Sequence, residues 1–270
     1  LDFRLAKAEL AHKWGAARPD LLEESDTLIL EQFYHPVIEA HLLARGAAYQ
    51  RQMVTIPQGT TVLTGANMGG KSVTLKAMAL SVILIHLGYF PPAAYAACPL
   101  FTFVSYSSDY FDTTRRGLST FASELVKIRD DLKQAGQGSG FVVLDEPFRG
   151  TSPGEATALV KALGLIYAGL PGALVMATHY EAPSGDGIRH LRLKDFLTED
   201  LDEIMAGFKE GSTDEELIRR IESLTDYSIE NVELPTQTWS GAFRLAAWLG
   251  LDPKLLELLE DEEEGSSWRN

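Results

Sequence analysis

The chain has 270 residues, of which 45% are hydrophobic and 23% are charged, a composition typical of a globular protein with a sizeable core. Its net charge of −14 argues against a surface that binds nucleic-acid phosphates directly, because such surfaces are basic. Cys98 is the only cysteine, which excludes an internal disulfide, suits a reducing, cytoplasmic compartment and predicts a small buried side chain.

The first part of the chain predicts helices and strands in alternation. Residues 1–18 place apolar side chains at helical spacing until Pro19 interrupts the pattern. β-branched residues predict strands over 27–33 and 53–65, and the second strand runs into a glycine-rich loop. Residues 71–87 predict a helix that is buried on nearly every face. Its apolar run is too short to span a membrane, so no membrane partner is expected.

The middle of the chain continues the alternation. In chain order it predicts a strand, a helix, a strand, a helix and a strand, over 100–106, 120–135, 141–145, 154–168 and 173–178. Continuous apolar strands such as 141–145 are typical of the centre of a parallel sheet. The alternation therefore predicts an α/β fold with a mostly parallel central sheet flanked by helices.

The pattern changes after His190. Residues 197–224 are polar and predict two short surface helices, and 227–234 predict a strand. Residues 239–264 predict a pair of helices, followed by a tail over 265–270. Since the chain begins at Leu1 rather than methionine, we expect it to be part of a longer protein.

A glycine-rich loop joins the strand that ends near Thr64 to the helix that begins near Lys71. It fits the pattern G-x-x-x-x-G-K-[ST], with Gly65, Ala66, Asn67, Met68, Gly69, Gly70, Lys71, Ser72 and Val73 as the expected ATP-binding residues. Glycines allow successive N–H groups to point at phosphate oxygens, and the helix N-terminus adds positive potential. Lys71 is expected to reach the β- and γ-phosphates, and the Ser72 hydroxyl is expected to bind Mg²⁺.

Two carboxylates follow a central strand in the segment FVVLDEP. Four apolar residues bring Asp145 to the carboxyl end of the strand, where α/β sheets bind ligands. Asp145 is expected to hold Mg²⁺ with Ser72, and Glu146 to orient or deprotonate the attacking water. The alternative is a strand that ends in a polar turn capped by Asp145.

His179 follows the predicted strand 173–178 in the same way, within ATHYE. Its position relative to the other two motifs favours a role near the γ-phosphate. A purely structural histidine is the alternative.

These segments together resemble the ATPase domain of the MutS family, which belongs to the P-loop ATPases of ABC type. The resemblance extends over nearly the whole chain and rests on TGANMGGKS, LSTFASEL (118–125), LDEPFRGTSP (144–153) and ATHY (177–180). The chain departs from the family pattern at Ala66, at Val73 and at Pro147–Phe148. Residues 182–235 fit the family poorly, so the resemblance is to a divergent member.

The resemblance implies a composite site in a homodimer. Ser119 and Thr120 of one subunit would face the ATP of the other, although Ser119 also suits a helix N-cap. The adenine would meet an apolar or aromatic side chain in 34–53. Tyr34 is one candidate, with core packing as its alternative.

The resemblance also implies a domain order. A lever-like helix and linker would occupy 1–26, the ATPase domain 27–238 and the helical pair 239–264, which would support dimerisation. Two functions stay open for this Mg²⁺-dependent ATPase. It would drive DNA processing of the mismatch-repair type through domains outside this chain, or it would remodel a protein client without DNA.

Overall fold

The computed structural model describes residues 2–23, 27–65, 70–108, 120–194 and 226–233. These residues belong to one compact unit, formed by 1–195 and 225–236. The predicted helices within 197–224 and 239–264 lie outside the described residues. No helix among the described residues is long and apolar enough to cross a membrane.

The described elements confirm a mixed α/β architecture. In chain order they are α1 (Asp2–Trp14), β1 (Asp20–Leu22), β2 (Leu28–Phe33), α2 (Pro36–Ala44), β3 (Gln52–Ile56), β4 (Gly59–Thr64), α3 (Lys71–His86), β5 (Tyr95–Pro99), β6 (Phe103–Ser107), α4 (Thr120–Ala135), β7 (Gly140–Asp145), α5 (Pro153–Ala168), β8 (Gly172–Ala177), β9 (Ile188–Leu193) and β10 (Ile229–Val232).

The described strands form two sheets. The larger has the order β10-β9-β4-β8-β7-β6, with β9, β4, β8, β7 and β6 parallel and β10 antiparallel to β9. The smaller has the order β1-β5-β2-β3, in which β2 is antiparallel to both of its neighbours. The smaller sheet was not expected from the sequence.

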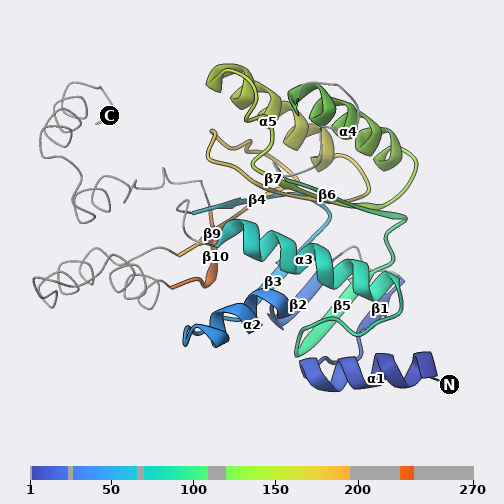
Figure 1. Ribbon diagram of the computed structural model, residues 1–270. Helices are drawn as coiled ribbons and strands as arrows, with labels where there is room; N and C mark the ends of the chain where they lie inside the picture. Colours follow the sequence, from blue (N-terminus) through green and yellow to red (C-terminus); the bar gives the residue numbers. More distant parts are fainter. Residues whose placement is uncertain (1, 24–26, 66–69, 109–119, 195–225, 234–270) are drawn as a thin grey trace, which may run out of the picture. The chain divides into compact units, whose positions relative to one another are not determined.

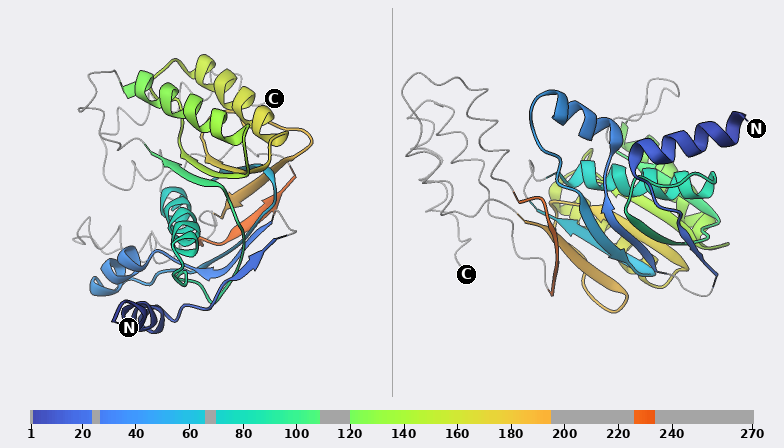
Figure 2. Two further views of the ribbon diagram at one scale, coloured as in Figure 1. Left: turned by 90° about the vertical axis from the view of Figure 1, so that its right-hand side faces the viewer. Right: turned by 90° about the horizontal axis from the view of Figure 1, so that it is seen from below.

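Helices cover both faces of the larger sheet. Helix α3 lies between the two sheets, while α4 and α5 pack on the opposite face of the larger one (Figures 1 and 2). Strand β7 shows why its apolar run is continuous: Phe141 and Val143 face the α3 side, and Val142 and Leu144 face α4 and α5. Because β4, β8 and β7 are parallel neighbours, their carboxyl ends lie at the same edge of the sheet.

The prediction of one strand over 53–65 is wrong. Strand β3 ends at Ile56 and β4 begins at Gly59, and the two belong to different sheets. Pro57 lacks the N–H that a continuing ladder needs, and it therefore marks the break. The burial patterns differ accordingly, because β3 alternates buried and exposed side chains whereas β4 is buried throughout.

His190 makes the folded state sensitive to mild acid. Its side chain is buried in β9, its Nδ1 has no hydrogen-bond partner among the described residues, and burial lowers its pKa. In the unfolded chain the imidazole takes up a proton near pH ~6.5, so the unfolded state binds more protons below that pH. We expect the free energy of unfolding to fall as the pH decreases from neutral through this range.

Urea unfolding at a series of pH values measures this effect. A His190→Leu variant should show a weaker pH dependence than the wild type in that range, and equal slopes would contradict this role of His190.

Candidate active site

The phosphate loop begins and ends at glycines that no other residue could replace without strain. Gly65 follows β4 with φ of 138°, and a Cβ there would lie 3.0 Å from the Leu193 carbonyl oxygen. Gly70 caps α3 in the left-handed conformation, with φ of 79°. The intervening Ala66, Asn67, Met68 and Gly69 lie outside the described residues. The glycines therefore meet the backbone requirement inferred from the motif.

Lys71 is the first residue of α3 and is only 4% exposed. Its Nζ donates a hydrogen bond of 2.6 Å to the carbonyl oxygen of Gly65. An ammonium at a helix N-terminus adds to the positive potential there, which favours an anionic ligand. Val73 lies in the same first turn and is half-buried.

Ser72 and Asp145 come together from α3 and β7. The Ser72 hydroxyl donates to Asp145 Oδ1 over 3.1 Å, and both side chains are partly exposed. A hydroxyl and a carboxylate are the oxygen donors that Mg²⁺ prefers. The described residues contain no group of three or more His, Cys, Asp or Glu able to hold a metal ion. Ser72 and Asp145 are thus the residues that would hold Mg²⁺ in this site.

Tyr106 of β6 is a neighbour of Asp145 that sequence reasoning missed. Burial raises the pKa of Tyr106 to about 12, and the Asp145 carboxylate acts in the same direction, while the nearby Ser108 side chain acts against it. Within the described part of the chain, its buried hydroxyl makes no hydrogen bond of ordinary geometry. Tyr106 is therefore neutral at physiological pH.

Glu146 lies directly after β7. Its N–H donates to the Ala177 carbonyl oxygen over 2.9 Å, which ties it to the end of β8. Its carboxylate is paired with the guanidinium of Arg149. An ionised carboxylate accepts several hydrogen bonds, so this ion pair leaves Glu146 able to accept from water as well.

His179 follows β8, the strand between β4 and β7. Its ring is exposed and lies against Tyr180, with ring centroids 4.2 Å apart. Because β8 separates the strand of Gly65 from the strand of Asp145, the topology brings His179 to the same sheet edge. Its role there stays a prediction.

The remaining predicted residues are Ser119, Thr120 and Tyr34. Ser119 lies outside the described residues, and Thr120 is the first residue of α4. Tyr34 is buried, and its hydroxyl donates to the Trp14 carbonyl oxygen over 2.7 Å. This contact supports core packing, the alternative given above for Tyr34.

Residues from 182–235, the segment that fits the family pattern poorly, lie beside the phosphate loop. A Cβ at Gly70 would lie 3.2 Å from the Tyr227 ring. The Gln50 side-chain amide accepts from the Tyr227 N–H over 2.8 Å and donates to Asp226 over 3.0 Å. Although burial opposes it, hydrogen bonds from Gln50 and Ser228 and the charge of Lys194 hold the pKa of Asp226 at about 2. No sequence motif marks this cluster.

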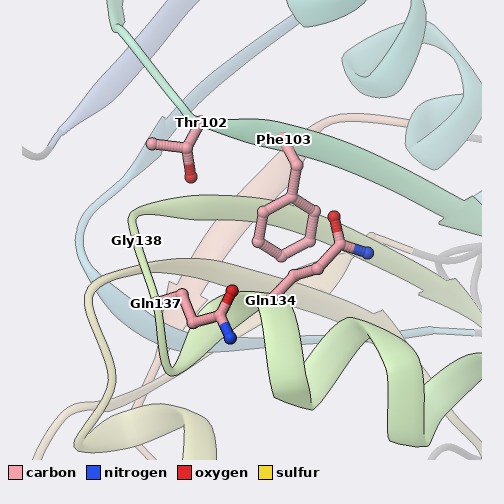
Figure 3. Close-up of a pocket in the computed structure, with 5 residues that line it drawn as sticks. All are labelled: Thr102, Phe103, Gln134, Gln137 and Gly138. Atoms are coloured by element: carbon pink, nitrogen blue, oxygen red, sulfur yellow. The ribbon is translucent and has the colours of Figure 1, made fainter.

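A surface pocket lies elsewhere on the molecule (Figure 3). It is lined by Thr102, Phe103, Gln134, Gln137 and Gly138, at the starts of β6 and β7 and the end of α4. Ligand sites of parallel sheets lie at the carboxyl ends of the strands, which is the other edge. This pocket is therefore separate from the candidate active site.

Comparison with known proteins finds one matching family model and several relatives. The family model described as MutS domain V matches residues 61–193, a range that contains the phosphate loop, Asp145, Glu146 and His179. A DNA mismatch repair protein MutS of Shouchella clausii is 32% identical over 182 residues, which cover 67% of this chain and 21% of that relative.

Two further relatives are similarly distant. An Endonuclease MutS2 of Thermomicrobium roseum is 35% identical over 192 residues, covering 67% of this chain and 24% of the relative. A DNA mismatch repair protein msh3 of Emericella nidulans is 33% identical over 182 residues, covering 67% and 16%. The chain thus spans about a fifth of the length of these relatives.

Proposed function

Because this chain belongs to the MutS family as a divergent member, we propose that it binds ATP with Mg²⁺ at the edge of the larger sheet and hydrolyses it. The observation that carries the proposal is the meeting of three parts of the chain. The buried Lys71 spans the base of the phosphate loop, Ser72 bonds Asp145 across two elements, and Glu146 follows directly.

The residues divide the chemistry between them. Lys71 and the N-terminal N–H groups of α3 bind phosphate oxygens. Ser72 and Asp145 would hold Mg²⁺, which would supply positive charge against the phosphate oxygens. Glu146 accepts a proton from the attacking water while the water oxygen forms a bond to the γ-phosphorus. The bond between the γ-phosphorus and the β–γ bridging oxygen breaks at the same time. ADP and phosphate are the products.

The wider cycle belongs to the same proposal. Ser119 and Thr120 of a second copy would contact the γ-phosphate, so ATP would draw two subunits together and hydrolysis would release them. His179 would contribute a polar contact near the γ-phosphate. In this scheme, domains outside this chain couple the cycle to DNA, as the names of the relatives suggest.

The acidity of the chain is also compatible with a second candidate partner, a protein client. The net charge of −14 suits a chain that leaves nucleic acid to other domains, and it suits equally an ATPase that acts on a protein client. The two functions differ in whether DNA changes the rate of turnover.

Steady-state ATP hydrolysis by the full-length protein tests both, at fixed low salt, with and without duplex, mismatched and branched DNA. Stimulation by one DNA form supports coupling to DNA. Turnover that is indifferent to every form supports a protein client, and the absence of Mg²⁺-dependent turnover contradicts the proposed ATPase.

Tyr227 provides a prediction for nucleotide affinity. Since its ring lies against Gly70, we expect it to contact the nucleoside, and aromatic stacking on a base contributes ~1–3 kcal/mol. A Tyr227→Ala variant should weaken ATP binding by about 10-fold, since ~1.4 kcal/mol corresponds to that factor. Fluorescence titration with a labelled ATP analogue measures the change. Tyr227→Phe, which keeps the ring, should bind as the wild type does, and unchanged affinity in Tyr227→Ala would refute the contact.

A further inference from the structure

The loop that follows β7 contains two non-glycine residues in the left-handed region. Glu146 has φ of 53° and Phe148 has φ of 66°. Residues with a Cβ persist in this region only where surrounding contacts hold them, and such sites concentrate where conformation serves function. The Glu146 N–H bonds the end of β8, and the Phe148 side chain is only 2% exposed.

Helix α4 holds this loop at two points. Glu124 Oε1 accepts a hydrogen bond of 2.9 Å from the Phe148 N–H, which fixes one of the two left-handed residues. A Cβ at Gly150 would lie 2.9 Å from the Cβ of Phe121, so the loop and the first turn of α4 are in close steric contact. Both contacts involve the beginning of the helix, next to the predicted Ser119 and Thr120.

The middle of α4 is fixed to the larger sheet by a polar cluster. The Ser105 hydroxyl of β6 donates to Asp131 Oδ2 over 2.8 Å, and both residues are buried. The Lys127 ammonium bonds Ser105 and lies 3.3 Å from the same Asp131 oxygen. These contacts fix α4 on the sheet, so they hold Glu124 at a defined position relative to the loop that carries Glu146.

We propose that Glu124 is a positioning residue for hydrolysis, which fixes Glu146 through the Phe148 N–H and links the loop to the start of α4. This inference rests on the proposed ATPase function. Glu124 acts through the backbone: by accepting from the Phe148 N–H, it determines the conformation from which Glu146 acts. Through the same link, contact of a second subunit with the start of α4 would change the conformation of the loop that carries Glu146.

The test compares Glu124→Ala with two matched variants in the full-length protein. Misplacing a catalytic group by about 1 Å costs up to ~100-fold in rate, so Glu124→Ala should lower kcat by about 10- to 100-fold. The Kd for ATP should change by less than about 2-fold, because the phosphate loop is untouched. Glu124→Gln keeps an acceptor oxygen and should retain most of the wild-type kcat. Asp130→Ala removes an exposed carboxylate from the same helix and should leave kcat unchanged.

A second variant approaches the same contact from the loop. Gly150→Ala places a methyl group against Phe121 and should also lower kcat while ATP still binds. Wild-type kcat in Glu124→Ala would overturn the inference, as would equal losses in Glu124→Ala and Glu124→Gln. If wild-type turnover is abolished by Glu146→Gln but unaffected by Glu124→Ala, the ATPase proposal stands and only this inference fails. Absence of turnover in the wild type overturns both.

Discussion

Replacing Glu146 by glutamine should reduce ATP turnover by about 100- to 10,000-fold, the usual contribution of a general base. Glutamine has nearly the same shape but cannot accept the proton of the attacking water at neutral pH. The phosphate loop, Ser72 and Asp145 remain intact, so ATP binding should persist. Single-turnover hydrolysis measures the chemical step, and equilibrium titration measures the affinity.

The control for this variant is its ion-pair partner. Arg149→Gln removes the guanidinium that pairs with Glu146 but leaves the carboxylate, so hydrolysis should persist. If Glu146→Gln hydrolyses ATP at the wild-type rate, another group must be the base.

Replacing Lys71 by methionine should weaken ATP binding by about 100-fold. The methionine fills a similar volume, so the buried site stays packed, but the charge that faces the phosphates is lost. Truncating one partner of a buried, hydrogen-bonded charge pair costs ~3 kcal/mol, which corresponds to about 100-fold in Kd. Isothermal titration calorimetry with ATP and Mg²⁺ measures the loss.

Lys76 provides the matched control on the same helix. It lies beyond the first turn of α3 and is only partly buried, so Lys76→Met should bind ATP as the wild type does. Equal affinity in Lys71→Met and the wild type would show that the phosphate loop does not bind the nucleotide.

The sequence predicted the parts of the fold that local pattern determines. The continuous apolar runs gave β7 and β8, and the helices predicted near 71–87 and 120–135 match α3 and α4. Strand β5 was missed because its alanines have weak strand propensity. Strand β9 was missed because IRHLRL mixes polar and apolar side chains on both of its faces, and His190 is buried together with Leu191 and Leu193.

The candidate site was predictable only where a motif spans consecutive residues. The phosphate loop and the Asp145–Glu146 pair follow directly from local sequence. By contrast, the Tyr227–Gly70 contact joins residues far apart in the chain, and the Glu124–Phe148 bond depends on how α4 packs beside the loop after β7. Such contacts are determined by tertiary packing, which local propensity does not encode.

We propose that one Mg²⁺·ATP binds at the sheet edge where Gly65, Lys71, Ser72 and Asp145 meet. The most direct test of this claim is calorimetric titration of the full-length Glu146→Gln protein with ATP, because this variant should not consume the nucleotide during the measurement. We predict one saturable site per chain with a Kd within about 1 µM to 1 mM, weakened when Mg²⁺ is removed. Absence of saturable binding at millimolar ATP in a folded protein would contradict the claim.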